Sequence, residues 1–160
     1  MSWFEDNNIG DDIARQLLRI KFTDGENVIE RDMRPDVVID YDNLEHQLDE
    51  TPAAFLFYSS MLAEAKKQVA ALERTIKYRR AKLAKELFDA SKNDTVKLRA
   101  SDIEILLDSD DNLLALESKL IGAERTLSKV YAAVDAIKMK SEHLRSLAGF
   151  KKQELRDSDL

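Results

Sequence analysis

The sequence contains no cysteine and few residues that break helices. Without a thiol in 160 residues, disulfides, cysteine-based zinc sites and thiol nucleophiles are excluded. Glycine occurs four times and proline twice, and only 7% of the residues are aromatic, so a thick globular core is not expected. The remaining composition, 44% apolar and 35% charged, is typical of long helices and coiled coils. We therefore expect apolar side chains to be buried along helix seams.

Long apolar runs and catalytic motifs are also missing. No stretch approaches the ~18 consecutive apolar residues of a membrane-spanning helix, so no membrane partner is expected. The acidic start MSWFEDNNIGDD lacks the apolar segment of a secretory signal, which favours the cytoplasm. The two histidines are far apart, and there is no glycine-rich phosphate loop, HExxH or nucleophile elbow. We expect no enzymatic activity, no metal site and no cofactor.

The net charge of −6 is unevenly distributed along the chain. Residues 1–54 hold 14 acidic and 5 basic side chains, whereas residues 55–100 hold 5 acidic and 11 basic ones. Within residues 66–85, eight basic side chains are accompanied by one acid, Glu73. The middle of the chain therefore presents a positive field of its own, although the protein as a whole is acidic.

Residues 1–36 are expected to form an acidic N-terminal arm. Residues 11–22 carry apolar side chains at three- to four-residue spacing, which suits a short amphipathic helix, and residues 23–25 suit a turn. A mobile arm and a short docking motif both remain open. The helical domain is expected over residues 37–150, and a frayed tail over residues 151–160.

A first long helix is predicted to begin at Thr51 and Pro52. Asp40 or Asp42 can cap a short helix before it, and Thr51 then suits an N-cap with proline at the first helical position. No glycine or proline follows until about residue 90. An apolar residue recurs every seven positions, as is typical of a coiled-coil seam. These residues are Phe55, Leu62, Val69, Ile76 and Leu83.

A second long helix follows a polar loop at residues 89–102. The pair Ser101 and Glu104 suits a capping box, an interruption is expected near residues 108–111, and Gly149 suits a stop. The fold class is therefore all-α, an antiparallel hairpin of two coiled-coil-like helices of about 39 residues each. Two helices bury little surface, so a homo-oligomer is expected. The candidate oligomerisation seam is Leu113, Leu116, Leu120, Leu127, Val130, Val134, Ile137 and Leu144.

The basic segment is the strongest functional signal. On a helix, one stripe carries Lys67, Arg74, Tyr78, Lys82 and Lys85, and a neighbouring stripe carries Lys66, Lys77 and Arg80. Charges of one sign repel one another unless an anion such as a phosphate backbone compensates, and Tyr78 could stack on a base. Three interpretations stay open at this point: a nucleic-acid surface, a pairing face for the acidic N-terminal region, and a solvated helix face.

Three short motifs occur in a fixed order along residues 36–152. They are Val-Ile-Asp at residues 38–40, Phe-Tyr-Ser at residues 57–59 and Ala-Val-Asp-Ala-Ile-Lys at residues 133–138. In this order and at this spacing they resemble the UvsY family, the recombination mediators of T-even-type phages.

The resemblance implies a non-enzymatic protein that binds single-stranded DNA as a ring-like homo-oligomer in the cytoplasm of the infected bacterial host. Such a protein helps a RecA-like recombinase to displace the single-strand-binding protein and to form a filament. The implied DNA contacts are Lys77, Arg79, Arg80, Lys82 and Lys85, and the second helix is implied in oligomerisation. Single-stranded DNA binding is thus the favoured function. The alternative is a coiled-coil scaffold whose basic stripe pairs with its own acidic arm.

Overall fold

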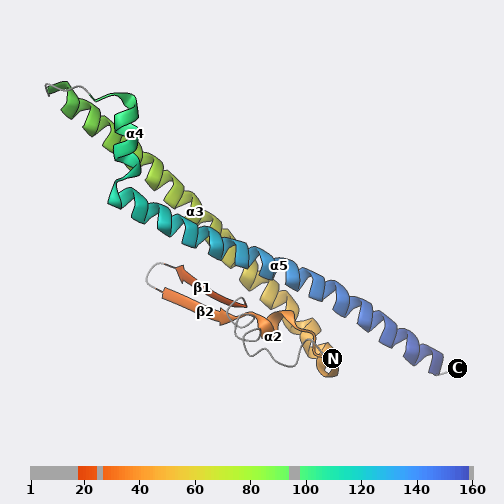
Figure 1. Cartoon of the computed structure of the whole chain (residues 1–160). Coiled ribbons are helices and arrows are strands. Elements are labelled where there is room, and N and C mark those ends of the chain that lie inside the picture. The colour runs from red at the N-terminus through yellow and green to blue at the C-terminus, as the bar shows by residue number, and fades with distance from the viewer. Residues whose placement is uncertain (1–17, 25–26, 94–97, 159–160) are drawn as a thin grey trace, which may run out of the picture. The chain divides into compact units, whose positions relative to one another are not determined.

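The structure is a computed structural model of the whole chain that describes residues 18–24, 27–93 and 98–158 (Figure 1). Helices dominate it, as predicted. The elements are β1 (Arg19–Asp24), β2 (Asn27–Asp32), α2 (Arg34–Val37), the 3-10 helix η1 (Tyr41–Asn43), α3 (Leu44–Asn93), α4 (Ala100–Asp108) and α5 (Asp111–Ser158). At 50 and 48 residues, α3 and α5 are longer than the expected 39. None of the described helices is long and apolar enough to cross a membrane.

The chain divides into two compact units. Unit 1 contains the residues up to Glu64 and those from Ser128 onward, and unit 2 contains Ala65–Leu127. Both long helices contribute to both units, because each passes a boundary without interruption. Unit 1 therefore holds the strands, the start of α3 and most of α5, while unit 2 holds the rest of α3, α4 and the start of α5.

The N-terminal segment forms an antiparallel β-hairpin, so the all-α prediction is wrong for residues 19–32. Ile20 pairs with Arg31 and Phe22 with Ile29, and the alternation of side chains leaves Ile20 and Phe22 buried. The helix expected over residues 11–22 is wrong where it meets β1, and its residues 11–17 lie outside the described residues. The period-two pattern Arg-Ile-Lys-Phe-Thr competes with the helical spacing, and burial of its apolar face decides in favour of the strand.

Unit 1 has a well-packed core. The Nζ of Lys129 on α5 donates to the carbonyl of Arg19 at 3.3 Å, which brings β1 beside α5 within this unit (Figure 1). The side chains at most 5% exposed come from the hairpin, its exit, α3 and α5. They are Ile20, Phe22, Met33, Tyr58, Met61, Val130, Ala133, Val134, Ile137 and Leu144. The expected N-terminal arm thus contributes part of the core.

Helix α3 begins at Leu44, eight residues before the predicted first helical residue, Pro52. Pro52 lies inside the helix, and Thr51 is buried with its hydroxyl donating to the Gln47 carbonyl at 2.6 Å. The short helix and the long helix that the sequence suggested are therefore one. Upstream residues from Leu44 onward are mostly good helix formers, and their propensity outweighs the missing N–H of the proline.

Of two helix boundaries predicted in unit 2, one is wrong and one is confirmed. The expected capping box at Ser101 is wrong, because Asp102 accepts a hydrogen bond from the N–H of Arg99 at 2.9 Å and α4 begins at Ala100. The expected interruption is confirmed, since α4 ends at Asp108 and Asp110 caps α5 by accepting from the N–H of Leu113 at 2.9 Å.

Helix α5 does not stop at Gly149 but continues to Ser158, so the expected tail is helical as far as the structure describes it. A single glycine costs a helix only about 1 kcal/mol relative to alanine. The flanking residues outweigh this cost, because good helix formers continue after it.

Candidate nucleic-acid interface

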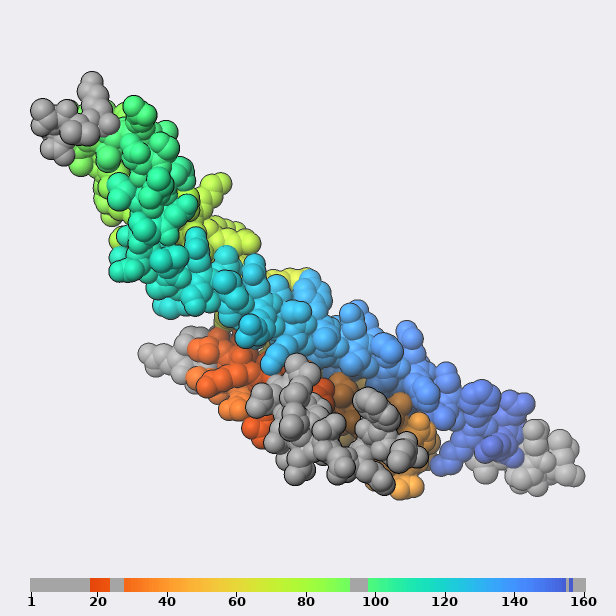
Figure 2. Space-filling model, viewed as in Figure 1, coloured from red at the N-terminus to blue at the C-terminus, as the bar shows by residue number. Residues whose placement is uncertain are grey.

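All nine predicted DNA-binding residues lie on α3 within unit 2. Lys67, Arg74, Tyr78 and Lys85 follow one another at steps of seven, four and seven, so they form one line along the helix, and all four are exposed. Lys66, Lys77 and Lys82 flank this line and are also exposed. Long α3 side chains project from the surface of unit 2 beside α4 (Figure 2). We call these seven residues the basic stripe.

Tyr78 is the aromatic member of the basic stripe. It is 70% exposed, so its ring is open to solvent and to a ligand. Cationic side chains precede and follow it by one turn, at Arg74 and Lys82. An exposed ring between cations can stack on a base while its neighbours meet the phosphates on either side.

Arg79 and Arg80 lie differently from the stripe. Arg79 stands seven residues after Leu72, on the seam side of the helix, and its Nε is buried without a hydrogen-bond partner among the described residues. Arg80 turns toward α4, and its Nη2 donates to Oε2 of Glu104 at 2.7 Å and to Oδ1 of Asp108 at 2.8 Å. The hydrogen bond to Glu104 and then that to Asp108 raise the pKa of Arg80 above its ordinary value. Its guanidinium is already occupied by two carboxylates.

One exposed carboxylate lies close to Lys82 of the basic stripe. Nζ of Lys82 lies 3.9 Å from Oε1 of Glu86, one turn further along the helix, and both side chains are more than half exposed. Such a pair is weak, because solvent screens it and both side chains lose rotamer freedom. Lys82 therefore remains able to exchange this carboxylate for a phosphate.

Comparison with known protein families identifies a match that includes the basic stripe. The family model described as "Recombination, repair and ssDNA binding protein UvsY" matches residues 32–154. This chain belongs to the UvsY family. The resemblance seen in three short motifs is thereby confirmed, and the match includes the whole basic stripe.

Solved structures show the same fold at low identity. One crystal structure of the bacteriophage T4 recombination mediator protein UvsY, lattice type IV, has a TM-score of 0.62 and 17% identity over 76% of this chain and 92% of that chain. The lattice type II structure has a TM-score of 0.61 and 18% identity over 77% and 92%. No curated protein matches the chain. The UvsY match begins at residue 32, so nearly all of the β-hairpin precedes it.

The predicted oligomerisation residues of this UvsY-family chain lie mostly in its own core. Leu113 in unit 2 is 1% exposed, and Val130, Val134, Ile137 and Leu144 in unit 1 are at most 4% exposed, so these five side chains have no free surface for a second copy. Leu116, Leu120 and Leu127 are half-buried. The seven-residue repeat does not distinguish a seam within a chain from one between chains. Among the side chains of α5 whose exposure the structure describes, the exposed large apolar ones are Leu114, Ile121, Tyr131, Met139 and Phe150.

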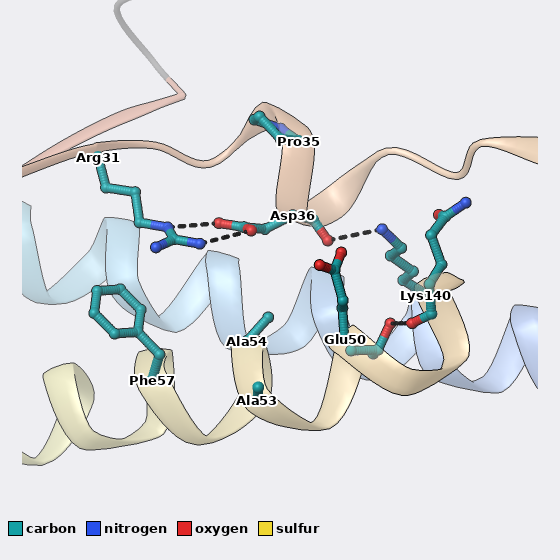
Figure 3. A pocket seen from close by; sticks show the side chains of 10 residues that line it. Arg31, Pro35, Asp36, Glu50, Ala53, Ala54, Phe57 and Lys140 are labelled. Atoms are coloured by element: carbon teal, nitrogen blue, oxygen red, sulfur yellow. Dashed lines mark hydrogen bonds and ion pairs between the residues drawn. The ribbon is translucent and has the colours of Figure 1, made fainter. Parts of the chain in front are cut away.

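Unit 1 holds a polar cluster that the sequence did not indicate. Nε and Nη2 of Arg31 each donate to the Asp36 carboxylate at 2.8 Å, and the Tyr58 hydroxyl donates to it at 2.7 Å. The Arg31 guanidinium also lies over the Phe57 ring, 4.7 Å from its centre, and Nζ of Lys140 donates to the Asp36 carbonyl at 3.1 Å (Figure 3). The cluster joins β2, α2, α3 and α5, elements whose contact no sequence spacing predicts.

Burial and hydrogen bonding act in opposite directions on this cluster. Burial acts to raise the pKa of Asp36, but the hydrogen bonds from Arg31 and Tyr58 outweigh it and the pKa is lowered. Burial also lowers the pKa of Lys140. A pocket of about 300 Å³ adjoins the cluster, with Ala53 and Ala54 among its lining residues (Figure 3). Among the described residues, no group of His, Asp and Glu side chains is placed to hold a metal ion.

Proposed function

We propose that this UvsY-family protein is a non-enzymatic recombination mediator that binds single-stranded DNA through the basic stripe. The observation that carries the proposal is the line of exposed Lys67, Arg74, Tyr78 and Lys85 on one uninterrupted helix. Lysine and arginine neutralise phosphates and release their counterions, and tyrosine stacks on any base. Because neither contact reads base edges, the binding is independent of sequence.

Self-association multiplies the stripe in this proposal. A ring-like homo-oligomer of helical hairpins would present many stripes to one strand, and the linked contacts raise the affinity through effective concentration. On α5, apolar surface for contacts between copies is supplied by the exposed Leu114 and Ile121 and the half-buried Leu116 and Leu120.

Single-stranded DNA held along the basic stripes of the ring would be loosened from the single-strand-binding protein and offered to a RecA-like recombinase. This would take place in the cytoplasm of the infected host.

Fluorescence anisotropy with labelled poly-dT at two salt concentrations tests the binding step. Arg74→Gln with Lys85→Gln removes two stripe cations, and Lys119→Gln with Arg125→Gln removes two exposed cations of α5 in the same unit. We expect the stripe variant to lose at least tenfold in affinity. Its logarithmic salt slope should be about 1.4 shallower, because two phosphate contacts are lost. The α5 variant should stay within threefold of the unaltered protein.

Two results would contradict the proposal. Equal losses in both variants would assign the binding to net charge rather than to the stripe. Absence of binding at low salt, with an intact oligomer by light scattering, would favour the alternative scaffold in which the stripe pairs with the acidic arm.

The mediator step needs a second assay. A RecA-like recombinase hydrolyses ATP on single-stranded DNA, and a covering single-strand-binding protein delays it. The unaltered protein should shorten this delay, and the Arg74 and Lys85 double variant should not. A variant that fails to bind DNA yet shortens the delay would show that the mediator activity does not depend on DNA binding by the basic stripe.

A further inference from the structure

We infer that α4 regulates the DNA-binding face: Glu104 and Asp108 hold Arg80 in the absence of DNA, and a phosphate must displace them before Arg80 can join the interface. We call these two carboxylates the acidic latch. The inference rests on the proposed function, since it needs DNA on the basic stripe.

The geometry of the latch is specific. Both carboxylates accept from the same nitrogen, Nη2 of Arg80, at 2.7 and 2.8 Å, the short distances of charge-assisted hydrogen bonds. Glu104 and Asp108 are four residues apart, so they share one face of α4. Leu107 on α4 is 2% exposed and fixes the direction in which that face points. All these groups lie in unit 2.

Arg80 lies between the basic stripe and the seam of α3. It follows Lys77 of the stripe by three residues and Ile76 of the seam by four, so its side chain must turn toward Lys77 to reach DNA on the stripe. Its guanidinium offers the fork of N–H groups that binds a phosphate as well as a carboxylate. While Glu104 and Asp108 occupy it, the cation is neutralised and two carboxylates surround it, where they repel a phosphate that approaches Arg80.

The latch is suited to release. The side chains of Glu104 and Asp108 are 62% and 68% exposed, and solvent-exposed ion pairs are weak. Helix α4 has nine residues, of which Leu107 is the buried one, and a two-residue break separates it from α5. Few contacts therefore oppose the exchange of carboxylate for phosphate, and the latch lowers the affinity for DNA without abolishing it.

A charge-matched pair of variants tests the latch by poly-dT anisotropy. Glu104→Gln with Asp108→Asn removes both carboxylates and keeps the side-chain shapes, whereas Glu117→Gln with Glu124→Gln removes two acids of α5 in the same unit. We expect the latch variant to bind about fivefold more tightly than the unaltered protein. Its salt slope should be steeper by up to about 0.7, since Arg80 then contacts a phosphate in every complex rather than only in those in which the latch has opened. The α5 variant should gain less than twofold.

Introducing Arg80→Gln into the unaltered protein and into the latch variant tests whether the gain in DNA affinity comes from Arg80. This substitution should weaken binding less in the unaltered protein, where the latch holds Arg80 in part of the complexes, than in the latch variant, where it should cancel most of the gain. A latch variant that binds no more tightly than the α5 variant, or that keeps its gain without Arg80, would overturn the inference. The single change Glu104→Gln, which keeps one ion pair, should give a smaller gain of the same sign.

Failure of the latch and failure of the proposed function give different results. If the unaltered protein binds poly-dT and the Arg74 and Lys85 double variant does not, the stripe stands whatever the latch variants do. If no variant binds at low salt, both ideas fail together. Far-UV circular dichroism serves as the control that each variant remains helical.

Discussion

Along α3, the large side chains of Tyr58 and Met61 in unit 1 are at most 5% exposed. In unit 2, the seam residues Val69, Ile76 and Leu83 are only half-buried, and the most buried apolar residue of α3 there is the small Ala65, 2% exposed. Unit 1 gains its burial from the hairpin, which packs beside the long helices there. Unit 2 has α4 instead, a short helix with one buried side chain. Regions with few buried contacts open more easily, and binding surfaces are often found in them.

Charge is used differently in the two units. In unit 1, Arg31 and Asp36 satisfy each other, and Tyr58 adds a hydrogen bond, so the charges join elements of the fold. In unit 2, most basic side chains of α3 point to solvent, and Arg80 is paired with exposed acids. Charged side chains thus join elements of the fold in unit 1, whereas unit 2 presents the charge that we propose binds DNA.

The largest expected effect is a core truncation in unit 1. Ile137 is 0% exposed, so Ile137→Ala should lower the free energy of unfolding by about 3 kcal/mol through lost burial and a residual cavity. Ile105 on α4 in unit 2 is 67% exposed, and Ile105→Ala should cost less than about 0.5 kcal/mol. Urea denaturation monitored by circular dichroism measures both. Similar losses would remove the distinction between the units.

The next effect concerns the polar cluster of unit 1. Asp36→Asn should lower the free energy of unfolding at pH 7 by about 1–2 kcal/mol, a range reduced because the Arg31 side chain is 42% exposed. Asp135→Asn, which loses an exposed pair with Lys138, should cost less than about 0.5 kcal/mol. Urea denaturation at pH 7 would show whether the two changes differ.

The pH dependence of this difference has a defined sign. The folded-state pKa of Asp36 lies below the ordinary value of 3.8, so the unfolded chain takes up the proton first as the pH falls. The contribution of the carboxylate is therefore complete above about pH 5 and disappears as the pH falls through the folded-state pKa. A difference between the Asp36→Asn variant and the unaltered protein that stays constant down to pH 2 would contradict this explanation.

A smaller effect is expected for the exposed ring of unit 2. Tyr78→Ala should weaken poly-dT binding by about 1 kcal/mol, or about fivefold, because one stacking contact is lost. Tyr78→Phe keeps the ring and should bind as the unaltered protein does. Since Tyr78 is 70% exposed, its truncation should leave the urea midpoint unchanged. A loss of stability without a loss of DNA affinity would show that Tyr78 contributes to packing and not to DNA binding.

The smallest effect concerns the pair between Lys82 and Glu86. Glu86→Gln should lower the free energy of unfolding by less than about 0.5 kcal/mol, since a solvent-exposed pair one turn apart is weak. The same change should raise DNA affinity slightly, because Lys82 loses a competing carboxylate. A stability loss as large as that of Asp36→Asn would show that unit 2 also depends on its ion pairs.

Much of the secondary structure could be predicted from local pattern. The seven-residue repeat predicted α3 and α5, and the polar residues near Asp110 predicted the break before α5. The strands were missed, because Ile20 satisfies a helical spacing with Leu17 and an alternating spacing with Phe22 at once. The packing partner that selects between these patterns lies more than 100 residues away, as the hydrogen bond from Lys129 to Arg19 shows.

The candidate site, too, could be predicted from local pattern only in part. The line of Lys67, Arg74, Tyr78 and Lys85 follows from helical periodicity and is exposed as expected. The different positions of Arg79 and Arg80 do not follow from it, because one belongs to the seam and the other meets Glu104 and Asp108 on α4. The predicted oligomerisation seam, too, could not be assigned to one chain or to two copies.

The sequence by itself determined the long helices, the basic stripe and membership of the UvsY family, because each depends on residues close together along the chain or on motifs in a fixed order. Only the tertiary structure decided that residues 19–24 and 27–32 form paired strands, that Val130 and Ile137 fill a core within the chain, and that Arg80 is paired. Burial and ion pairing depend on which distant segments meet. Local propensity does not contain that information.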